Sequence, residues 1–165
     1  MFTVGILTMS DKGSRGERED ISGKVIGDIV TSTFDCKIVK REILPDEKDI
    51  IAKKLSEWSD EGGIDVILTT GGTGLAERDV TPDATLSIID KEVPGIPEAV
   101  RLGTLSKTPM AMLSRAVAGI RKKTLIINMP GSPKAVRECL EIINQALPHA
   151  IEIMTGKYTE HPVSR

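Results

Sequence analysis

The stretch DVILTTGGTG (65–74) decides the fold class. Its first six residues form a largely apolar run, which is typical of a strand buried on both faces of a parallel sheet. Gly71-Gly72-Thr73-Gly74 then ends the strand in a loop whose backbone amides can approach an anion closely. A strand that ends in such a loop predicts an α/β protein with its ligand site at the carboxyl edge of the sheet.

Further apolar runs alternate with helical patterns on both sides of this stretch, as in successive βα units. We predict additional strands at Thr3–Met9, Phe34–Leu44 and Thr124–Met129. The spacing of apolar residues predicts helices over 21–30, 46–61, 81–90, 97–106, 110–119 and 132–147, with a further segment, 149–155, separated off by Pro148. The predicted fold is a three-layer α/β/α sandwich with a mostly parallel central sheet. Residues 1–156 form one domain in this interpretation, and 157–165 form a polar tail.

Helix boundaries follow from capping residues. Asp46 and Ser132 are expected to be N-caps, and Thr81-Pro82 is expected to supply an N-cap followed by a proline at the first helical position. Gly62-Gly63 is expected to end the second helix.

The composition excludes several classes of protein. The 165 residues include 22 basic and 24 acidic side chains and 2% aromatic residues, so neither an excess of positive charge nor a stacking surface indicates a nucleic-acid partner. No apolar run reaches the length of a membrane span, and no basic leader precedes the first strand. Two cysteines and two histidines argue against a closed zinc site or a disulfide framework. We therefore expect a cytoplasmic protein with an aliphatic core that binds neither nucleic acid nor membrane.

Glycines, hydroxyls and carboxylates follow the ends of four predicted strands. Ser10-Asp11 follows the first strand, Pro45-Asp46 the second, the glycine loop the third, and Pro130-Gly131-Ser132 the last. The glycine loop predicts phosphate binding, although a tight turn without a ligand would use the same residues. It matches neither the Rossmann nor the Walker A pattern. Pro130-Gly131-Ser132 is a second candidate anion site, although helix capping alone explains it more simply.

Three carboxylates are candidates for the chemistry. Asp46 is most simply an N-cap, and Asp83 is most simply a partner of a helix dipole. Asp79 has no evident capping role, so near bound phosphates it could hold Mg²⁺. Ser114 and Asn128 are polar residues in apolar surroundings, and satisfying local backbone groups is the commoner role of such residues.

Two longer segments, LTTGGTGLAERDVTPDAT (68–85) and MLSRAVAGIRKKTLIINMPGSPKAVRECLE (112–141), resemble the Mog/MoaB family of molybdenum-cofactor biosynthesis. Residues 2–14, 44–47 and 92–95 fit the same pattern, so the resemblance covers nearly the whole chain. Within the family it is nearest to the Mog-type molybdopterin adenylyltransferases, which are relatives of the gephyrin G domain. One departure is Gly131-Ser132-Pro133, where many relatives have Gly-Asn-Pro or Gly-Gln-Pro.

The resemblance implies a function and a set of site residues. It implies a homotrimer that binds molybdopterin and ATP with Mg²⁺, transfers AMP to the terminal phosphate of molybdopterin and releases pyrophosphate. The catalytic carboxylates, which are also the expected Mg²⁺ ligands, fall on Asp46 and Asp79. The expected substrate-binding residues are Ser10, Asp11, Thr70, Gly71, Gly72, Thr73, Gly74, Ser114, Asn128, Pro130, Gly131 and Ser132.

A second function class shares this fold. A binding protein of the same family would hold molybdopterin, or serve in assembly with other molybdenum-cofactor enzymes, without transferring AMP. A phosphate monoester is largely dianionic at neutral pH, so the transfer requires alignment rather than a strong base. The presence of both Asp46 and Asp79 favours the enzyme. The segment Val93–Met112 is either an interface segment or part of the core.

Overall fold

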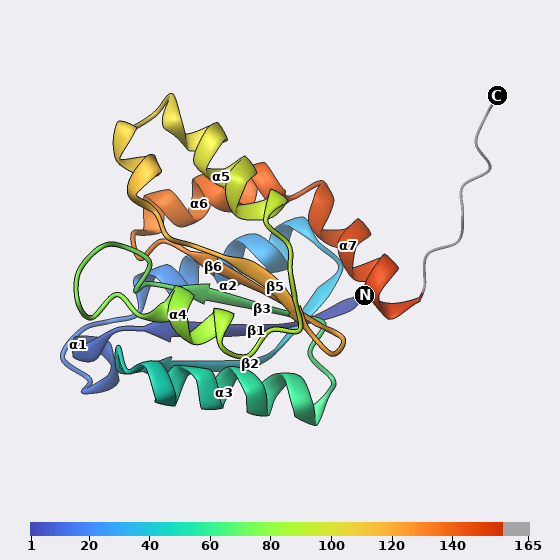
Figure 1. Ribbon diagram of the computed structural model, residues 1–165. Helices are drawn as coiled ribbons and strands as arrows, with labels where there is room; N and C mark the ends of the chain where they lie inside the picture. Colours follow the sequence, from blue (N-terminus) through green and yellow to red (C-terminus); the bar gives the residue numbers. More distant parts are fainter. Residues whose placement is uncertain (157–165) are drawn as a thin grey trace.

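The computed structural model describes residues 1–156, so the predicted tail at 157–165 lies outside the described residues. The described residues form a six-stranded sheet with the strand order β2-β1-β3-β6-β5-β4 (Figure 1). The strands are β1 (Phe2–Met9), β2 (Cys36–Leu44), β3 (Val66–Thr70), β4 (Lys91–Glu92), β5 (Ala118–Arg121) and β6 (Thr124–Met129).

The sheet is parallel except at one edge. β2, β1, β3 and β6 run in the same direction, whereas β5 is antiparallel to both β6 and β4. The carboxyl ends of the four parallel strands therefore meet at one edge of the sheet, as the sequence predicts. This arrangement confirms the mostly parallel α/β fold.

Helices cover both faces of the sheet. They are α1 (Asp11–Ser14), α2 (Ile21–Thr33), α3 (Lys48–Glu61), α4 (Thr81–Leu86), α5 (Gly95–Leu105), α6 (Pro133–Ile143) and α7 (Ala146–Thr155), with a 3₁₀ turn, η1 (Pro109–Leu113). None of the helices within 1–156 has the length and apolarity required to cross a membrane.

Alternation along the strands divides the core into two layers. Ile6, Leu68 and Ile127 pack with residues of α2, α6 and α7 on one face. Leu7 and Ile67, their neighbours in the chain, pack with α3 and α4 on the other face. Successive side chains of a strand point to opposite faces, so strands that are apolar at every position require helices on both sides.

Several predicted boundaries are confirmed. Ser132 caps α6, because its Oγ accepts a hydrogen bond from the Ala135 amide at 3.1 Å. Gly62, with φ of 76°, follows the last residue of α3.

Two predicted N-caps are wrong. Glu47 precedes α3 and Val80 precedes α4, and neither side chain makes a capping hydrogen bond. The Asp46 carboxylate instead accepts from the Asp11 amide, and the Thr81 hydroxyl donates to the Gly71 carbonyl. Both polar groups are used by tertiary contacts rather than by the adjacent helix.

The second half of the chain departs from the predicted elements. The helix expected over 110–119 is wrong: η1 ends at Leu113 and Ala118–Arg121 forms β5. The helix expected to reach Asp90 ends at Leu86, before β4. Pro148 does not separate two segments but lies in the first turn of α7, where a missing N–H leaves no helical hydrogen bond unmade.

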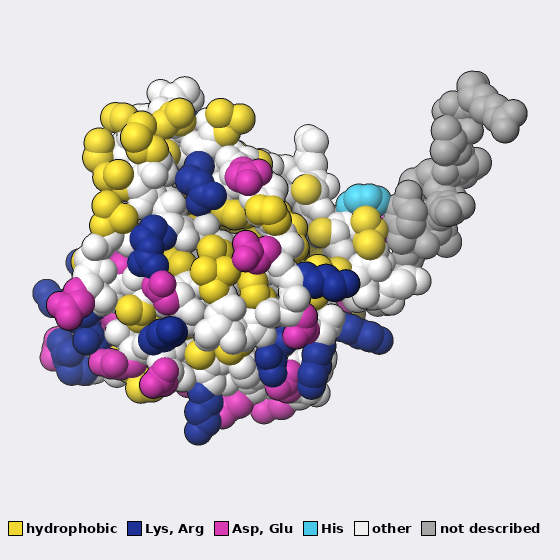
Figure 2. Space-filling view, viewed as in Figure 1, with side chains coloured by type: hydrophobic (Ala, Val, Ile, Leu, Met, Phe, Trp, Pro, Cys, Tyr) yellow, Lys and Arg dark blue, Asp and Glu magenta, His cyan; other side chains and the backbone are white. Residues whose placement is uncertain are grey.

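Large apolar side chains are exposed on one part of the surface. Figure 2 shows them gathered over α5 and η1, whereas charged side chains dominate the part over α3. We call this set the α5–η1 apolar surface, and it consists of Leu75, Leu102, Leu105, Met110, Met112 and Leu113.

Candidate active site

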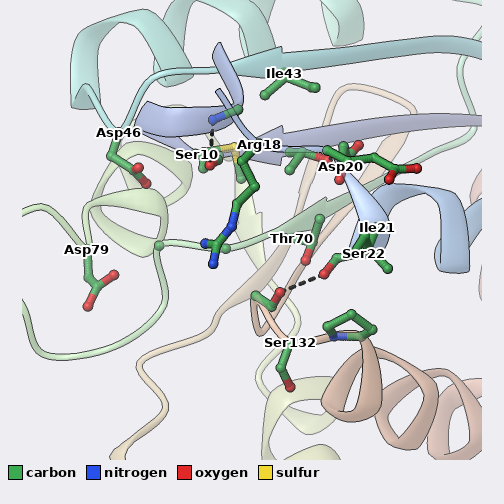
Figure 3. Close-up of a pocket in the computed structure, with 18 of the residues that line it drawn as sticks. Ser10, Arg18, Asp20, Ile21, Ser22, Ile43, Asp46, Thr70, Asp79 and Ser132 are labelled. Atoms are coloured by element: carbon green, nitrogen blue, oxygen red, sulfur yellow. Dashed lines mark hydrogen bonds between the residues drawn. The ribbon is translucent and has the colours of Figure 1, made fainter. Parts of the chain in front are cut away.

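A cavity of about 580 Å³ opens at the carboxyl edge of the parallel strands. It lies among the ends of β1, β2 and β3, the N-terminus of α2 and the loop that precedes α6 (Figure 3). The sequence-predicted site residues in its lining are Ser10, Asp46, Thr70, Gly71, Gly72, Asp79, Gly131 and Ser132.

The glycine loop requires glycine at two positions. Gly71 and Gly72 have φ of 95° and 67°, a region that other residues rarely adopt. A Cβ at Gly71 would collide with the Met9 carbonyl, and one at Gly72 would collide with the Thr81 hydroxyl. The Gly71 amide donates to the Met129 carbonyl at 3.1 Å, which ties the loop to the end of β6.

Several backbone amides around the cavity are available as donors. Within residues 1–156, the N–H groups of Gly72, Thr73 and Gly74 donate no hydrogen bond, and neither do those of Gly131 and Ser132. Such sets of donors in glycine-rich turns and ahead of helices favour anions. The two loops are joined to each other and to α2, because Thr70 Oγ1 donates to the Pro130 carbonyl and Ser22 Oγ to the Gly131 carbonyl.

Asp46 is held by Asp11 at one end of the cavity. The Asp11 amide donates to Asp46 Oδ2, and the Asp46 amide donates to Asp11 Oδ1, both at 3.0 Å. Arg78 donates to both oxygens of Asp11, at 2.6 and 2.9 Å, and to Glu47 at 2.8 Å. Asp11 itself does not line the cavity, and its place beside Asp46 indicates a supporting contact.

Electrostatics distinguish these carboxylates. Burial raises the pKa of Asp46, and the negative charges of Asp11 and Asp79 raise it further. The hydrogen bonds from Arg78 lower the pKa of Asp11. Asp79 accepts one hydrogen bond at Oδ2, from the Ala76 amide at 2.9 Å.

The donor set fits a magnesium ion that is completed by substrate. Within the described part of the chain, no group of three or more His, Cys, Asp or Glu residues could hold a metal by itself. Mg²⁺ is commonly bound by one or two carboxylates together with phosphate oxygens. Asp46 and Asp79 are close enough for the charge of Asp79 to raise the pKa of Asp46, so a cation between them would relieve that repulsion.

A second cavity, of about 440 Å³, is lined by the other predicted residues except Asp11, which lines neither cavity. Thr73, Gly74, Ser114, Asn128 and Pro130 line this mainly apolar cavity beneath α5 and η1. The structure thus distributes the predicted set over two cavities, with the glycine loop contributing to both.

The side-chain nitrogen and oxygen of Asn128 are both hydrogen-bonded within the protein. It is 5% exposed; its Nδ2 donates to the hydroxyls of Thr69 and Thr85, and its Oδ1 accepts from the Val117 amide. Ser114 similarly accepts from the Ala116 amide. These contacts favour the role of satisfying local polar groups.

Some cavity residues were absent from the sequence-predicted set. Arg18, Asp20, Ser22 and Arg78 all line the first cavity. Arg18 lies within a run of charged residues that is indistinguishable from a solvated loop in the sequence. Asp20 precedes a helical pattern, so its capping of α2, with Oδ1 accepting from the Gly23 amide at 2.8 Å, was the one available signal.

Parallel strands that end in a glycine loop, with two carboxylates at the same edge, define an α/β protein whose site suits a phosphate-bearing ligand. A family model described as "Probable molybdopterin binding domain" matches residues 5–149. The chain belongs to this molybdenum-cofactor biosynthesis family, within which its relatives are Mog and MoaB proteins.

Individual relatives cover nearly the whole chain. A molybdopterin adenylyltransferase of Helicobacter pylori strain J99 is 44% identical over 95% of this chain and 90% of its own length. The molybdopterin adenylyltransferase of Escherichia coli K12 is 39% identical over 95% and 87%. The crystal structure of the molybdopterin biosynthesis enzyme MoaB from Thermus thermophilus is similar with a TM-score of 0.89, at 52% identity over 97% of this chain and all of that one.

Proposed function

We propose that this protein is a molybdopterin adenylyltransferase that transfers AMP from ATP to the terminal phosphate of molybdopterin and releases pyrophosphate. The observation that carries the proposal is the similarity over nearly the full chain to enzymes of that name, in a protein whose cavity combines the glycine loop with Asp46 and Asp79.

The chemistry suits a site without histidine. A terminal phosphate oxygen of molybdopterin attacks the α-phosphorus of ATP, a new P–O–P bond forms, and the bond between the α-phosphorus and the bridging oxygen breaks. Pyrophosphate leaves with that electron pair. The nucleophile is already ionised at neutral pH, since its second pKa is about 6, so the protein has to align two anions and reduce their repulsion.

Different residues of the cavity are suited to binding the phosphates and to reducing their repulsion. The unpaired amides of Gly72, Thr73, Gly131 and Ser132 are suited to binding phosphate oxygens. Asp46 and Asp79 would hold Mg²⁺, which neutralises phosphate charge when bound. Asp11 and Arg78 fix the position of Asp46 and of the loop that carries Asp79.

We further propose that the α5–η1 apolar surface is covered in a homotrimer, the assembly that the family resemblance implies. Leu102 is 75% exposed and Leu75 is 66% exposed, and contiguous apolar surfaces of this kind commonly mark protein interfaces. The cytoplasmic location and association with other molybdenum-cofactor enzymes stay predictions.

A binding protein without transferase activity is the competing function, because the likeness to MoaB structures does not separate the two. The deciding experiment incubates the purified protein with molybdopterin, ATP and MgCl₂ and follows pyrophosphate release and adenylylated molybdopterin. We expect both products, and neither when MgCl₂ is replaced by EDTA. Tight binding of molybdopterin without either product would favour the binding protein.

A further inference from the structure

The first cavity contains an arginine that no structural contact uses. Arg18 belongs to the loop between α1 and α2, and Figure 3 shows its side chain extended into the cavity. Within residues 1–156, its guanidinium makes no hydrogen bond or ion pair. A guanidinium has five donors and strongly favours planar or tetrahedral oxyanions, so an unused one in a cavity indicates a ligand group.

The other charges around the cavity make this arginine distinctive. Four carboxylates line it, from Glu19, Asp20, Asp46 and Asp79, against two guanidinium groups. The guanidinium of Arg78 is already bound by Asp11 and Glu47. Among the described lining residues, Arg18 is therefore the cation left to meet an incoming anion.

The loop positions Arg18 from both sides. On the preceding side, the amides of Gly16 and Glu17 donate to the carbonyls of Gly13 and Lys12, at 3.0 and 2.9 Å. On the following side, Asp20 accepts from the Gly23 amide and from Thr8 Oγ1. These contacts hold the backbone on either side of Arg18 and leave its exposed side chain free to meet a ligand in the cavity.

We infer that Arg18 binds a phosphoryl group of one of the two substrates and so helps to determine substrate affinity, an inference that rests on the proposed function. With either substrate, a phosphate oxygen would accept a hydrogen bond from the Arg18 guanidinium. The source is either the polyphosphate of ATP or the terminal phosphate of molybdopterin. Arg18 acts in binding, since the proposed transfer requires no proton from it.

The test compares Arg18→Gln with Arg18→Lys and with Lys24→Gln as a matched control. Lys24 lies six residues further on, is exposed, makes no described side-chain contact and lines neither cavity. Its substitution removes the same charge from the same region. Titration calorimetry with inorganic pyrophosphate gives a readout independent of turnover, and steady-state kinetics give KM for ATP and for molybdopterin separately.

We expect Arg18→Gln to weaken phosphate binding by about 10- to 100-fold, the scale of one charge-assisted hydrogen bond. A loss of pyrophosphate affinity with a higher KM for ATP assigns Arg18 to the polyphosphate. A higher KM for molybdopterin with unchanged pyrophosphate affinity assigns it to the terminal phosphate. Arg18→Lys should recover part of the loss, and Lys24→Gln should match the wild type in all three measurements.

Two results separate this inference from the proposed function. An active wild type whose Arg18→Gln variant keeps both KM values and its pyrophosphate affinity overturns the role of Arg18 alone. A wild type that forms no product, but whose pyrophosphate binding is lost in Arg18→Gln, overturns the transferase and leaves Arg18 as a phosphate ligand.

Discussion

Asp79 and Asp46 differ at the scale of single contacts, although both are carboxylates at the same cavity. Asp79 is half-buried and accepts one hydrogen bond, from Ala76, at the end of an otherwise exposed loop. Asp46 is held by a reciprocal pair of hydrogen bonds with Asp11 and is close to two other negative charges. Substitutions by asparagine should therefore have different effects on stability and on activity.

For Asp79→Asn we expect the fold to persist and AMP transfer to fall by roughly 100-fold or more, as when a group that stabilises transition-state charge is lost. Asparagine can still accept from the Ala76 amide, so the free energy of unfolding should change by less than about 0.5 kcal/mol. Steady-state turnover and denaturant unfolding check the two parts. Glu77→Gln, on an exposed neighbour outside both cavities, should leave turnover unchanged. Wild-type turnover in Asp79→Asn would remove its proposed role.

For Asp46→Asn we expect a stability effect that depends on pH. The pKa of Asp46 is raised above its ordinary value of 3.8, so the folded protein binds this proton more tightly than the unfolded chain does. The free energy of unfolding therefore decreases as the pH rises from 3.8 through the raised pKa. Above that pKa, the buried negative charge of Asp46 destabilises the folded protein. Asp46→Asn removes that cost, so its Tm should exceed that of the wild type at pH 7, and the difference should shrink as the pH falls below about 4.

The same variant tests the magnesium site without an activity assay. Excess MgCl₂ with pyrophosphate should raise the Tm of the wild type by mass action, and it should raise that of Asp46→Asn less. Asp28→Asn, on the exposed side of α2, serves as the neutral control at every pH. A lower Tm for Asp46→Asn at pH 7 would mean that its hydrogen bonds outweigh the cost of its buried charge.

At the scale of elements, the important feature is the loop over residues 74–80, which carries Asp79 between β3 and α4. Two arginines hold it. Arg78 connects it to α1 and to the residue before α3, and Arg115 donates to the Asp79 carbonyl at 3.0 Å while pairing with Asp83. Within the loop, the Asp79 amide donates to the Ala76 carbonyl and the Val80 amide to the Arg78 carbonyl, and the two arginines connect this turn to the rest of the molecule.

We expect Arg78→Gln to loosen this loop and reduce turnover by about 10- to 100-fold, the range typical when a residue that orients a metal ligand is removed. Stability should fall by no more than about 1 kcal/mol, because these ion pairs are exposed. Faster hydrogen exchange of residues 74–80, measured with kcat, checks the positioning role. Arg121→Gln breaks a comparable pair with Asp60 outside both cavities and should leave kcat unchanged.

Some helices and strands follow from the local sequence, whereas others do not. The strands Val66–Thr70 and Thr124–Met129 follow from apolar runs that require burial on both faces, and α6 follows from its cap and apolar stripe. The helix predicted over 110–119 overlaps the first two residues of Ala118–Arg121, because a short apolar run is ambiguous by periodicity. Ala118–Arg121 becomes a strand through its pairing with Thr124–Ile127, a partner that local pattern does not reveal.

At the scale of the whole molecule, the α5–η1 apolar surface indicates assembly. We expect light scattering to give about three chain masses for the wild type, in line with the proposed trimer and the prevalence of closed symmetric oligomers. Leu102→Glu should dissociate it, since a charge buried in an interface is costly. Ile50→Glu, an exposed apolar position on α3 that is 45% exposed, should not. A monomer at all wild-type concentrations would contradict the assembly.

The sequence by itself determined the parallel sheet, the positions of its loops and the types of chemical group at its carboxyl edge. A continuous apolar strand requires burial on both faces, and the positive φ of Gly71 and Gly72 requires glycine, so both features follow from the local sequence. Tertiary structure decided which polar groups remain available. The Asp46 carboxylate accepts from the Asp11 amide rather than capping a helix, the Asn128 side chain is hydrogen-bonded in the interior, and the predicted residues other than Asp11 line two separate cavities. Tertiary structure also left Arg18 unpaired, because hydrogen-bond partners come from segments distant in the chain and only their packing decides which groups are satisfied.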